Sequence, residues 1–435
     1  MSENSNAVRT TIIHRRSTAR APWWHTATIS EIPGVIDPRG AKMLQETVFS
    51  IARMGFTAVL FRPALMDFNR DLETLTELIT AIHRVGLKAI VRLSGADHAP
   101  TKEAEEPAAF FGFEQSTANL VVRARLALKA GADGIDLGRI EDTPVAAGSD
   151  SQSQRFTELT RILLAELADF SPDHILSAEA VAYYDDSLQR HLHEEWFHHL
   201  RDDRLAFVGF DADAILEEVS LTITERDQLG AVCAWRTMLP RLMGTPGVKR
   251  SYAGSWEEDA DDARRAAMRL VLCSLPGAIY LPFAFSGGRA EFEGPAARVS
   301  AASTEAELER HRHTTLALRI RNERRLATGT FASVSGLPWL RRGVQAVMSG
   351  SMLAVLNTSD GPITVPPQYQ LLLRSDSSRP QDNPAVMMEK NLAGGSFAEP
   401  DLKQAHAVGG ESAQDAGTQL PSGASAWFLP PVVNA

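Results

Sequence analysis

The sequence predicts an α/β protein, a (β/α)8 TIM barrel followed by a small C-terminal antiparallel β domain. From residue 23 to about residue 328, short apolar runs rich in β-branched residues alternate with longer amphipathic segments. The longer segments carry apolar residues at helical spacing, and several end in glycine, as helices commonly do. Eight such pairs predict a barrel, with functional residues at the C-terminal ends of its strands.

Each expected barrel strand coincides with one short apolar run. The strands are expected at 25–32, 56–63, 87–95, 132–140, 174–181, 205–212, 240–246 and 277–285. The clearest helical segments between them are 38–55, 70–86, 153–170 and 259–277. The regular succession of the two kinds of segment is what predicts a parallel sheet covered by helices.

The pattern changes after residue 328, where shorter alternating runs are separated by turn residues, as in an antiparallel β domain. We therefore divide the chain into an N-terminal tail (1–22), the barrel (23–328) and a C-terminal β-sandwich domain (329–435). Within the last domain, residues from about 377 to 423 are rich in Ser, Gly, Asp and Gln and are expected to form a flexible insertion.

The amino-acid composition excludes some classes of partner and indicates the cellular environment. The formal net charge is -10, which argues against nucleic acid or an anionic membrane as the main partner. The two cysteines, Cys233 and Cys273, lie in apolar segments and are expected to be buried thiols. No apolar run has the length of a signal peptide or a membrane span, so we expect a cytoplasmic protein. No cofactor or metal is expected.

Several segments along the chain resemble those of one enzyme family. They are "APWWHTATISEIPG" near the start, "IARMGFTAVLFRP" at the second strand, and "AHAVGGESA" with "LPSGASAWFL" near the end. Together they are similar to the α-amylase superfamily of glycoside hydrolases (family 13), particularly its α-glucosidase and trehalose synthase branch. The resemblance implies a barrel that here lacks most of the family's usual inserted subdomain, because "ADHAPTKEAEEPAAFF" runs directly into the next helix.

The family's catalytic motifs are altered at the third and fourth strands. In "AIVRLSGAD", Arg92 stands where the family has an Asp. In "DGIDLG", Asp136 replaces the family's Arg and Gly138 replaces its catalytic nucleophile. Strand alternation sends Arg92 and Asp136 to the barrel interior on neighbouring strands. We therefore predict an ion pair between them, a structural remnant of the former site.

The remaining motifs are only partly retained. In "ILSAEA", Glu179 keeps the position of the general acid/base. In "TPGVKR", matched to the seventh-strand motif, Gly247 replaces the transition-state-stabilising Asp and Arg250 is retained. Retaining glycoside hydrolysis needs two carboxylates about 5 to 5.5 Å apart, and Gly138 cannot act as one of them.

Two functional hypotheses follow from the resemblance. The first is a catalytically degenerate protein, more a pseudoenzyme than an enzyme, that acts as a binding, regulatory or assembly partner in α-glucan or trehalose metabolism. Its implied partners are an α-glucan, maltose or trehalose-like ligand, or an active homologous enzyme. The second is an active glycosidase or transglycosylase on α-glucosides that uses Glu179 and a relocated carboxylate.

Other polar and aromatic candidates have simpler interpretations. Asp211 and Asp213 could supply the relocated carboxylate, but they are placed to cap a following helix near the sixth strand. Asp97 and His98 are weak as a metal pair, because two adjacent loop residues are usually solvated. Trp23 and Trp24 are expected to pack at the base of the barrel.

Two further groups complete the prediction. Arg62 and Arg250 are expected to line the mouth of the former site. The histidines of "RHLHEEWFHHL" are expected on one amphipathic helix and not around a zinc ion, since His193 and His198 lie five residues apart and would point in different directions. The other two are His191 and His199.

Overall fold

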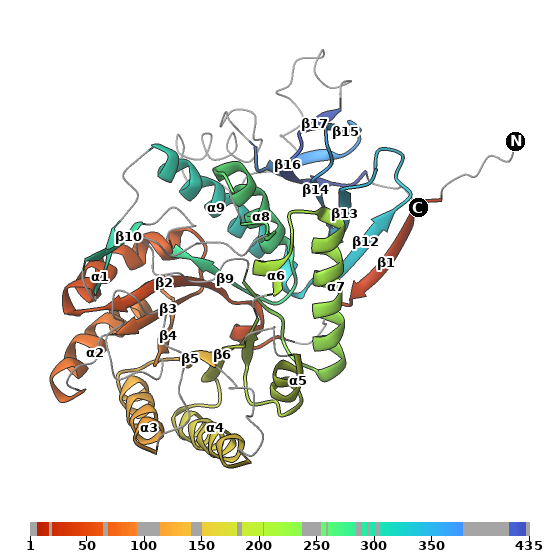
Figure 1. Ribbon diagram of the computed structural model, residues 1–435. Helices are drawn as coiled ribbons and strands as arrows, with labels where there is room; N and C mark the ends of the chain where they lie inside the picture. Colours follow the sequence, from red (N-terminus) through yellow and green to blue (C-terminus); the bar gives the residue numbers. More distant parts are fainter. Residues whose placement is uncertain are drawn as a thin grey trace, which may run out of the picture.

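The computed structural model has a barrel with an antiparallel sheet beside it, packed against the outer helices (Figure 1). It describes residues 7–16, 20–63, 68–93, 114–140, 150–180, 185–202, 204–236, 254–257, 260–283, 289–293, 296–300, 305–376 and 417–431. All structural statements below concern these residues.

Eight parallel strands form one sheet in the order β7-β6-β5-β4-β3-β2-β9-β8, which confirms the predicted barrel architecture. Most of them coincide with the expected apolar runs. Their bounds are β2 (Thr28–Ile36), β3 (Ala58–Pro63), β4 (Lys88–Arg92), β5 (Gly134–Ile140), β6 (Ile175–Ala180), β7 (His199–Arg201), β8 (Ala234–Arg236) and β9 (Ala278–Pro282).

Helices cover the outside of this sheet (Figure 1). In α1, Leu44, Val48 and Ile51 recur at helical spacing and are buried, and the Asp37 side chain caps the first turn by accepting from Gly40 N at 2.6 Å. The helices are α1 (Pro38–Arg53), α2 (Phe68–Arg84), α3 (Glu114–Lys129), α4 (Asp150–Phe170), α5 (Asp185–His193), α6 (Arg204–Phe207), α7 (Ala212–Leu229), α8 (Asp262–Ser274) and α9 (Glu305–Glu323).

One of the expected strands was placed wrongly, and another falls on residues that the structure does not describe. The run 205–212 contains α6 and the N-cap of α7, and the strand lies earlier, at β7. The next strand is β8, whereas the expected strand at 240–246 lies outside the described residues. Both observed strands are only three residues long, too short for an alternating pattern to reveal them.

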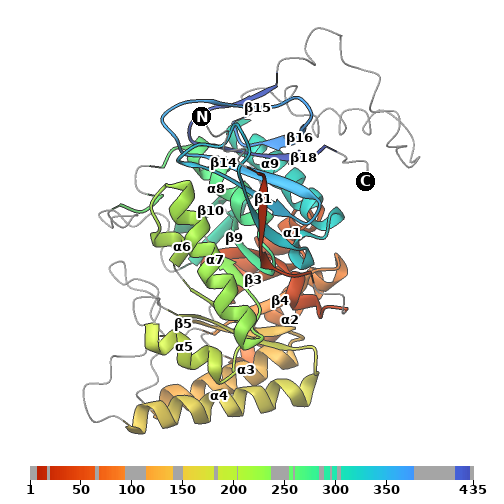
Figure 2. The ribbon, with the colours of Figure 1, turned by 90° about the vertical axis from the view of Figure 1, so that its right-hand side faces the viewer.

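The second sheet is antiparallel, in the order β1-β12-β13-β14-β18-β16. It lies against α7 and α8 (Figure 2). Its strands are β1 (Arg9–His14), β12 (Phe331–Ser335), β13 (Val344–Ser349), β14 (Met352–Asn357), β16 (Gln370–Arg374) and β18 (Ala424–Leu429). Apolar side chains of the two-stranded sheet β15 (Ile363–Val365) and β17 (Thr418–Leu420) complete its core.

Two segments expected to lack regular structure contain strands. Within 1–22, expected to be a tail, β1 pairs antiparallel with β12, and His14 Nδ1 lies 2.8 Å from Asp227 Oδ2 of α7. Within 377–423, expected to be an insertion, β17 pairs with β15. A separate hairpin, β10 (Arg289–Glu293) and β11 (Ala296–Ser300), lies beside α1.

The barrel interior is apolar towards the N-terminal ends of its strands. Its buried residues are Ala27, Ile29, Ala58, Leu60, Ile90, Ile175, Ala234, Ala278 and Tyr280. Trp23 and Trp24, in the short 3-10 helix η1 (Trp23–Thr26), pack against this cluster, so the prediction that they lie at the barrel base is confirmed.

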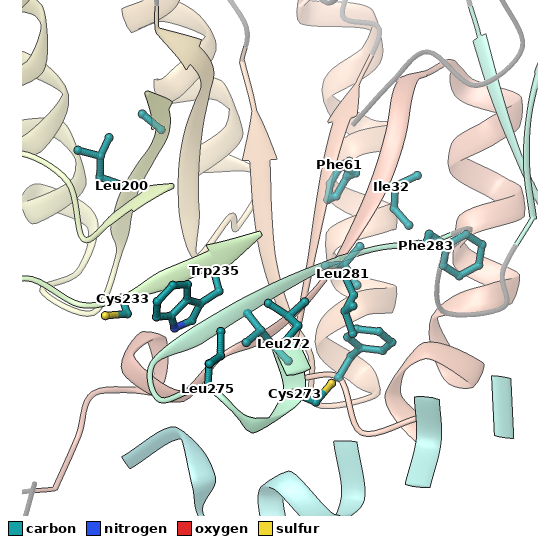
Figure 3. Close-up of a cluster of buried hydrophobic side chains, with 14 of the residues drawn as sticks. Ile32, Phe61, Leu200, Cys233, Trp235, Leu272, Cys273, Leu275, Leu281 and Phe283 are labelled. Carbon is teal, nitrogen blue, oxygen red and sulfur yellow. The ribbon is translucent and has the colours of Figure 1, made fainter. Parts of the chain in front are cut away.

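Outside the barrel, both cysteines are buried and free, as expected (Figure 3). No helix of the described part is both long and apolar enough to cross a membrane.

The end of α8 is held by a buried arginine from α9. Arg321 donates to the carbonyls of Cys273 at 2.9 Å, of Leu275 at 2.5 Å and of Gly277 at 2.5 Å. These carbonyls lie where a helix ends and lacks its own donors. Arg321 thus joins α9 to the connection between α8 and β9.

We expect Arg321→Met to lower the free energy of unfolding by about 3 kcal/mol, because it leaves buried carbonyls without donors. Urea denaturation measures this change. The matched control is Arg319→Met on the same helix, where the side chain is half exposed and pairs with Glu323; its effect should stay within about 0.5 kcal/mol. Equal losses in the two variants would contradict the capping role.

Candidate functional site

The predicted ion pair is present at the C-terminal end of the barrel. Arg92 and Asp136 are register partners on β4 and β5, and Arg92 Nε lies 2.8 Å from Asp136 Oδ1. Both side chains are buried, with exposed fractions of 4% and 0%. The pair therefore stands inside the barrel, as strand alternation predicts.

This pair belongs to a larger network of six charged side chains, which we call the barrel network. Its members are Glu31, Arg92, Asp136, Glu179, Arg201 and Arg236. Arg92 Nη2 lies 2.7 Å from Glu31 Oε1, and Arg201 Nη2 lies 2.7 Å from Asp136 Oδ2. The two terminal nitrogens of Arg236 contact Glu31 and Glu179. Three arginines thus balance three carboxylates in the buried interior.

The arginines determine the charge state of the buried carboxylates. Burial acts to raise the pKa of Glu31, but Arg236, Arg92 and Arg201 outweigh it and lower that pKa to about 2. Burial also opposes ionisation of Asp136, yet Arg201 and Arg92 hold its pKa well below the ordinary range. Both groups are therefore carboxylates at neutral pH.

Gly138 has a backbone role in this arrangement. Its φ is +67°, in the left-handed region that favours glycine, and the pairing of β5 with β6 is irregular between Asp136 and Arg139. The Gly138 N–H donates to Asp136 Oδ1 at 2.8 Å. The glycine thus allows the strand to turn its amide onto the carboxylate, and no functional group projects from this position.

A column of polar contacts connects the network to the base of the barrel. The Arg201 guanidinium lies over the Tyr280 ring, with 4.4 Å between its carbon and the ring centroid. His199 Nδ1 lies 2.7 Å from Tyr280 Oη, and His199 Nε2 lies 2.7 Å from the carbonyl of Trp24. Because a carbonyl only accepts, Nε2 donates to Trp24 and Nδ1 accepts from the tyrosine hydroxyl.

Other predicted residues have structural roles or lie beyond the described part. Asp211 caps α7 by accepting from Ala214 N at 2.9 Å, as expected, but this helix does not follow a sixth strand at 205–212. Asp213 contacts Gly343 and Gln345 of the C-terminal domain, so neither acid joins the barrel network. Arg62 is buried at the end of β3. Gly247, Arg250, Asp97 and His98 lie outside the described residues.

The single helix expected for four histidines was wrong. His191 and His193 lie on α5, which ends at His193, whereas His199 starts β7. His198 precedes that strand, and its Nδ1 accepts from Leu176 N at 3.1 Å. Within the described ranges, no three His, Cys, Asp or Glu side chains gather as a metal site would require.

Four participants were not singled out from the sequence. Arg201 and Arg236 end β7 and β8, two short strands that were not predicted from the sequence. Glu31 and Tyr280 lie within expected strands, at positions whose alternation points inward. A charged residue inside an apolar run such as "TISEI" was the available signal, since a buried charge requires a partner.

Solved structures share this architecture. The α-amylase from Geobacillus thermoleovorans, complexed with acarbose, matches with a TM-score of 0.56 and 12% identity over 94% of this chain and 99% of that chain. A Nostoc punctiforme debranching enzyme matches with a TM-score of 0.54 and 12% identity over 95% and 100% of the two chains. The chain has the α-amylase fold.

A third structure with this fold is an α-glucosyl transfer enzyme, XgtA, with a TM-score of 0.53 and 14% identity over 81% of this chain and 95% of that chain. The resemblance expected from the sequence is therefore confirmed at the level of the fold. No protein-family model and no curated protein sequence matches the chain.

We expect Asp136→Asn to lower the free energy of unfolding by about 3 to 5 kcal/mol, because it leaves Arg92 and Arg201 with an unbalanced buried charge. Thermal and urea unfolding both report the change. Asp169→Asn, on the exposed face of α4, is the matched control and should have little effect. A stable Asp136→Asn variant would remove the structural role assigned to the network.

Acid should weaken the contacts of His199. Burial lowers the pKa of His199 to about 3, compared with about 6.5 in an unfolded chain. The unfolded state therefore binds more protons between these values, and stability falls as the pH drops from 6.5 towards 3, by at most about 1.4 kcal/mol per pH unit from this group.

The measurement is the free energy of unfolding of wild type and His199→Gln at several pH values between 6.5 and 4.5. Carboxylates that also titrate there, such as Glu218, whose pKa burial raises, are the same in both proteins. His199→Gln should be less stable than wild type at neutral pH and should lose less stability per pH unit. His313, whose pKa burial also lowers to about 3, remains in both proteins, so some slope persists. Identical slopes in the two proteins would contradict the prediction.

Proposed function

We propose that this chain is a catalytically degenerate protein with the α-amylase fold, acting as a binding, regulatory or assembly partner in α-glucan or trehalose metabolism. The observation that carries the proposal is the barrel network. Glu179, at the position matched to the family's acid/base, is 5% exposed and contacts Arg236. A carboxylate that acts on a sugar must reach the scissile bond, which this burial and pairing oppose.

The matched nucleophile position supports the same proposal. Gly138 has no side chain, and its positive φ disfavours any residue that carries one. The adjacent acid, Asp136, is fully buried and contacts Arg92, Arg201 and Ser177. The fold neighbours include an α-amylase and a debranching enzyme, which connects the proposal to α-glucans.

The test is a paired assay on the purified protein. Hydrolysis of maltose, trehalose and an aryl α-glucoside is measured beside calorimetric binding of maltose and trehalose, for wild type, Glu179→Gln and Glu166→Gln. Glu166 pairs with Arg125 on the helical exterior and serves as the control. We expect no turnover in any of the three. Turnover that Glu179→Gln abolishes and Glu166→Gln retains would overturn the proposal.

One observation favours the alternative of an active glycosidase or transglycosylase. Glu31 and Glu179 contact the two terminal nitrogens of the same Arg236 guanidinium, which makes Glu31 the candidate relocated carboxylate. If the pair were catalytic, Glu31→Gln would abolish turnover together with Glu179→Gln, as expected for two carboxylates that act on one bond. Turnover lost in Glu179→Gln alone would exclude Glu31 from that role.

A further inference from the structure

The barrel sheet has a seam between β7 and β8. These strands are at opposite ends of the hydrogen-bonded order, and they lie next to each other in space. Among the described residues, no backbone ladder pairs them, whereas β7 pairs with β6 and β8 pairs with β9. Each strand spans three described residues. Within the part of the chain that the structure describes, the backbone thus provides little to hold this part of the barrel closed.

Side chains cross the seam instead. Arg236, at the end of β8, contacts Glu179 of β6, on the other side of β7. In the opposite direction, two residues of β7 reach β9 past β8. His199 accepts from the Tyr280 hydroxyl at 2.7 Å, and Arg201 stacks over the Tyr280 ring at 4.4 Å.

We propose that these five side chains form a clasp that closes the barrel in place of backbone hydrogen bonds, which makes the seam its site of opening. The clasp consists of Glu179, His199, Arg201, Arg236 and Tyr280. Local opening occurs where few contacts hold an element, and here the contacts are concentrated in a few side chains. Parting β7 from β8 separates Arg236 from Glu179 and uncovers the interior of the barrel network. The seam is thus a conformational device that gives access to this interior.

Hydrogen–deuterium exchange with mass spectrometry tests the clasp on the full-length protein. Tyr280→Phe removes the hydroxyl, which donates to His199 and also hydrogen-bonds Arg201, and keeps the ring beneath Arg201. We expect exchange in peptides covering β7 and β8 to rise by about tenfold, as loss of one buried hydrogen bond implies. Peptides covering β3, across the barrel from the seam in the strand order, should keep their wild-type rates.

Short strands exchange quickly in any protein, so the decisive readout is the response to the variant and not the wild-type rate. Tyr369→Phe makes the same chemical change in the C-terminal domain and should leave β7 and β8 unaffected. A second variant, Arg236→Met, should also raise exchange at the seam, because it removes the contact with Glu179. The proposal is overturned if Tyr280→Phe leaves the seam unchanged, or if it raises exchange equally in β3.

Discussion

Charge balance inside the barrel is the constraint on which the rest of this structure depends. Three arginines and three carboxylates lie at the C-terminal end of the strands, nearly removed from water. Moving a single ion from water into such a place costs several kcal/mol even after relaxation, so each must be compensated by a neighbour. The members of the barrel network come from six strands, and the order of those strands around the barrel brings the opposite charges together. The fold and the network therefore require each other.

The same constraint explains the neighbouring uncharged residues. Asp136 has two oxygens to satisfy, and Gly138 and Ser177 donate to them in addition to the arginines. Tyr280 offers its ring face to Arg201 and its hydroxyl to His199. A site of this kind is a packed polar core. In the enzymes that share the fold, the corresponding end of the barrel is where function is expected to lie.

The sequence was sufficient to predict the barrel, the terminal β domain and the contact between Arg92 and Asp136. That contact follows from alternation on two adjacent strands that were located correctly. The partners Arg201 and Arg236 could not be found in this way, because their strands span three residues and show no period of their own. The sixth strand was predicted at 205–212 because that run is apolar, but Asp211 within it caps the start of α7. Tertiary contacts, and not local pattern, decide where such short strands form.

The pairing of β1 with β12 has a consequence for how the chain is made. Residues 9–14 are synthesised before the barrel strands, yet β12, the strand beside which they lie, is synthesised only after them. β1 therefore has no partner strand in this sheet until the barrel has been synthesised. A recombinant fragment that starts at Trp23 would leave β12 as a bare sheet edge, which invites association between copies.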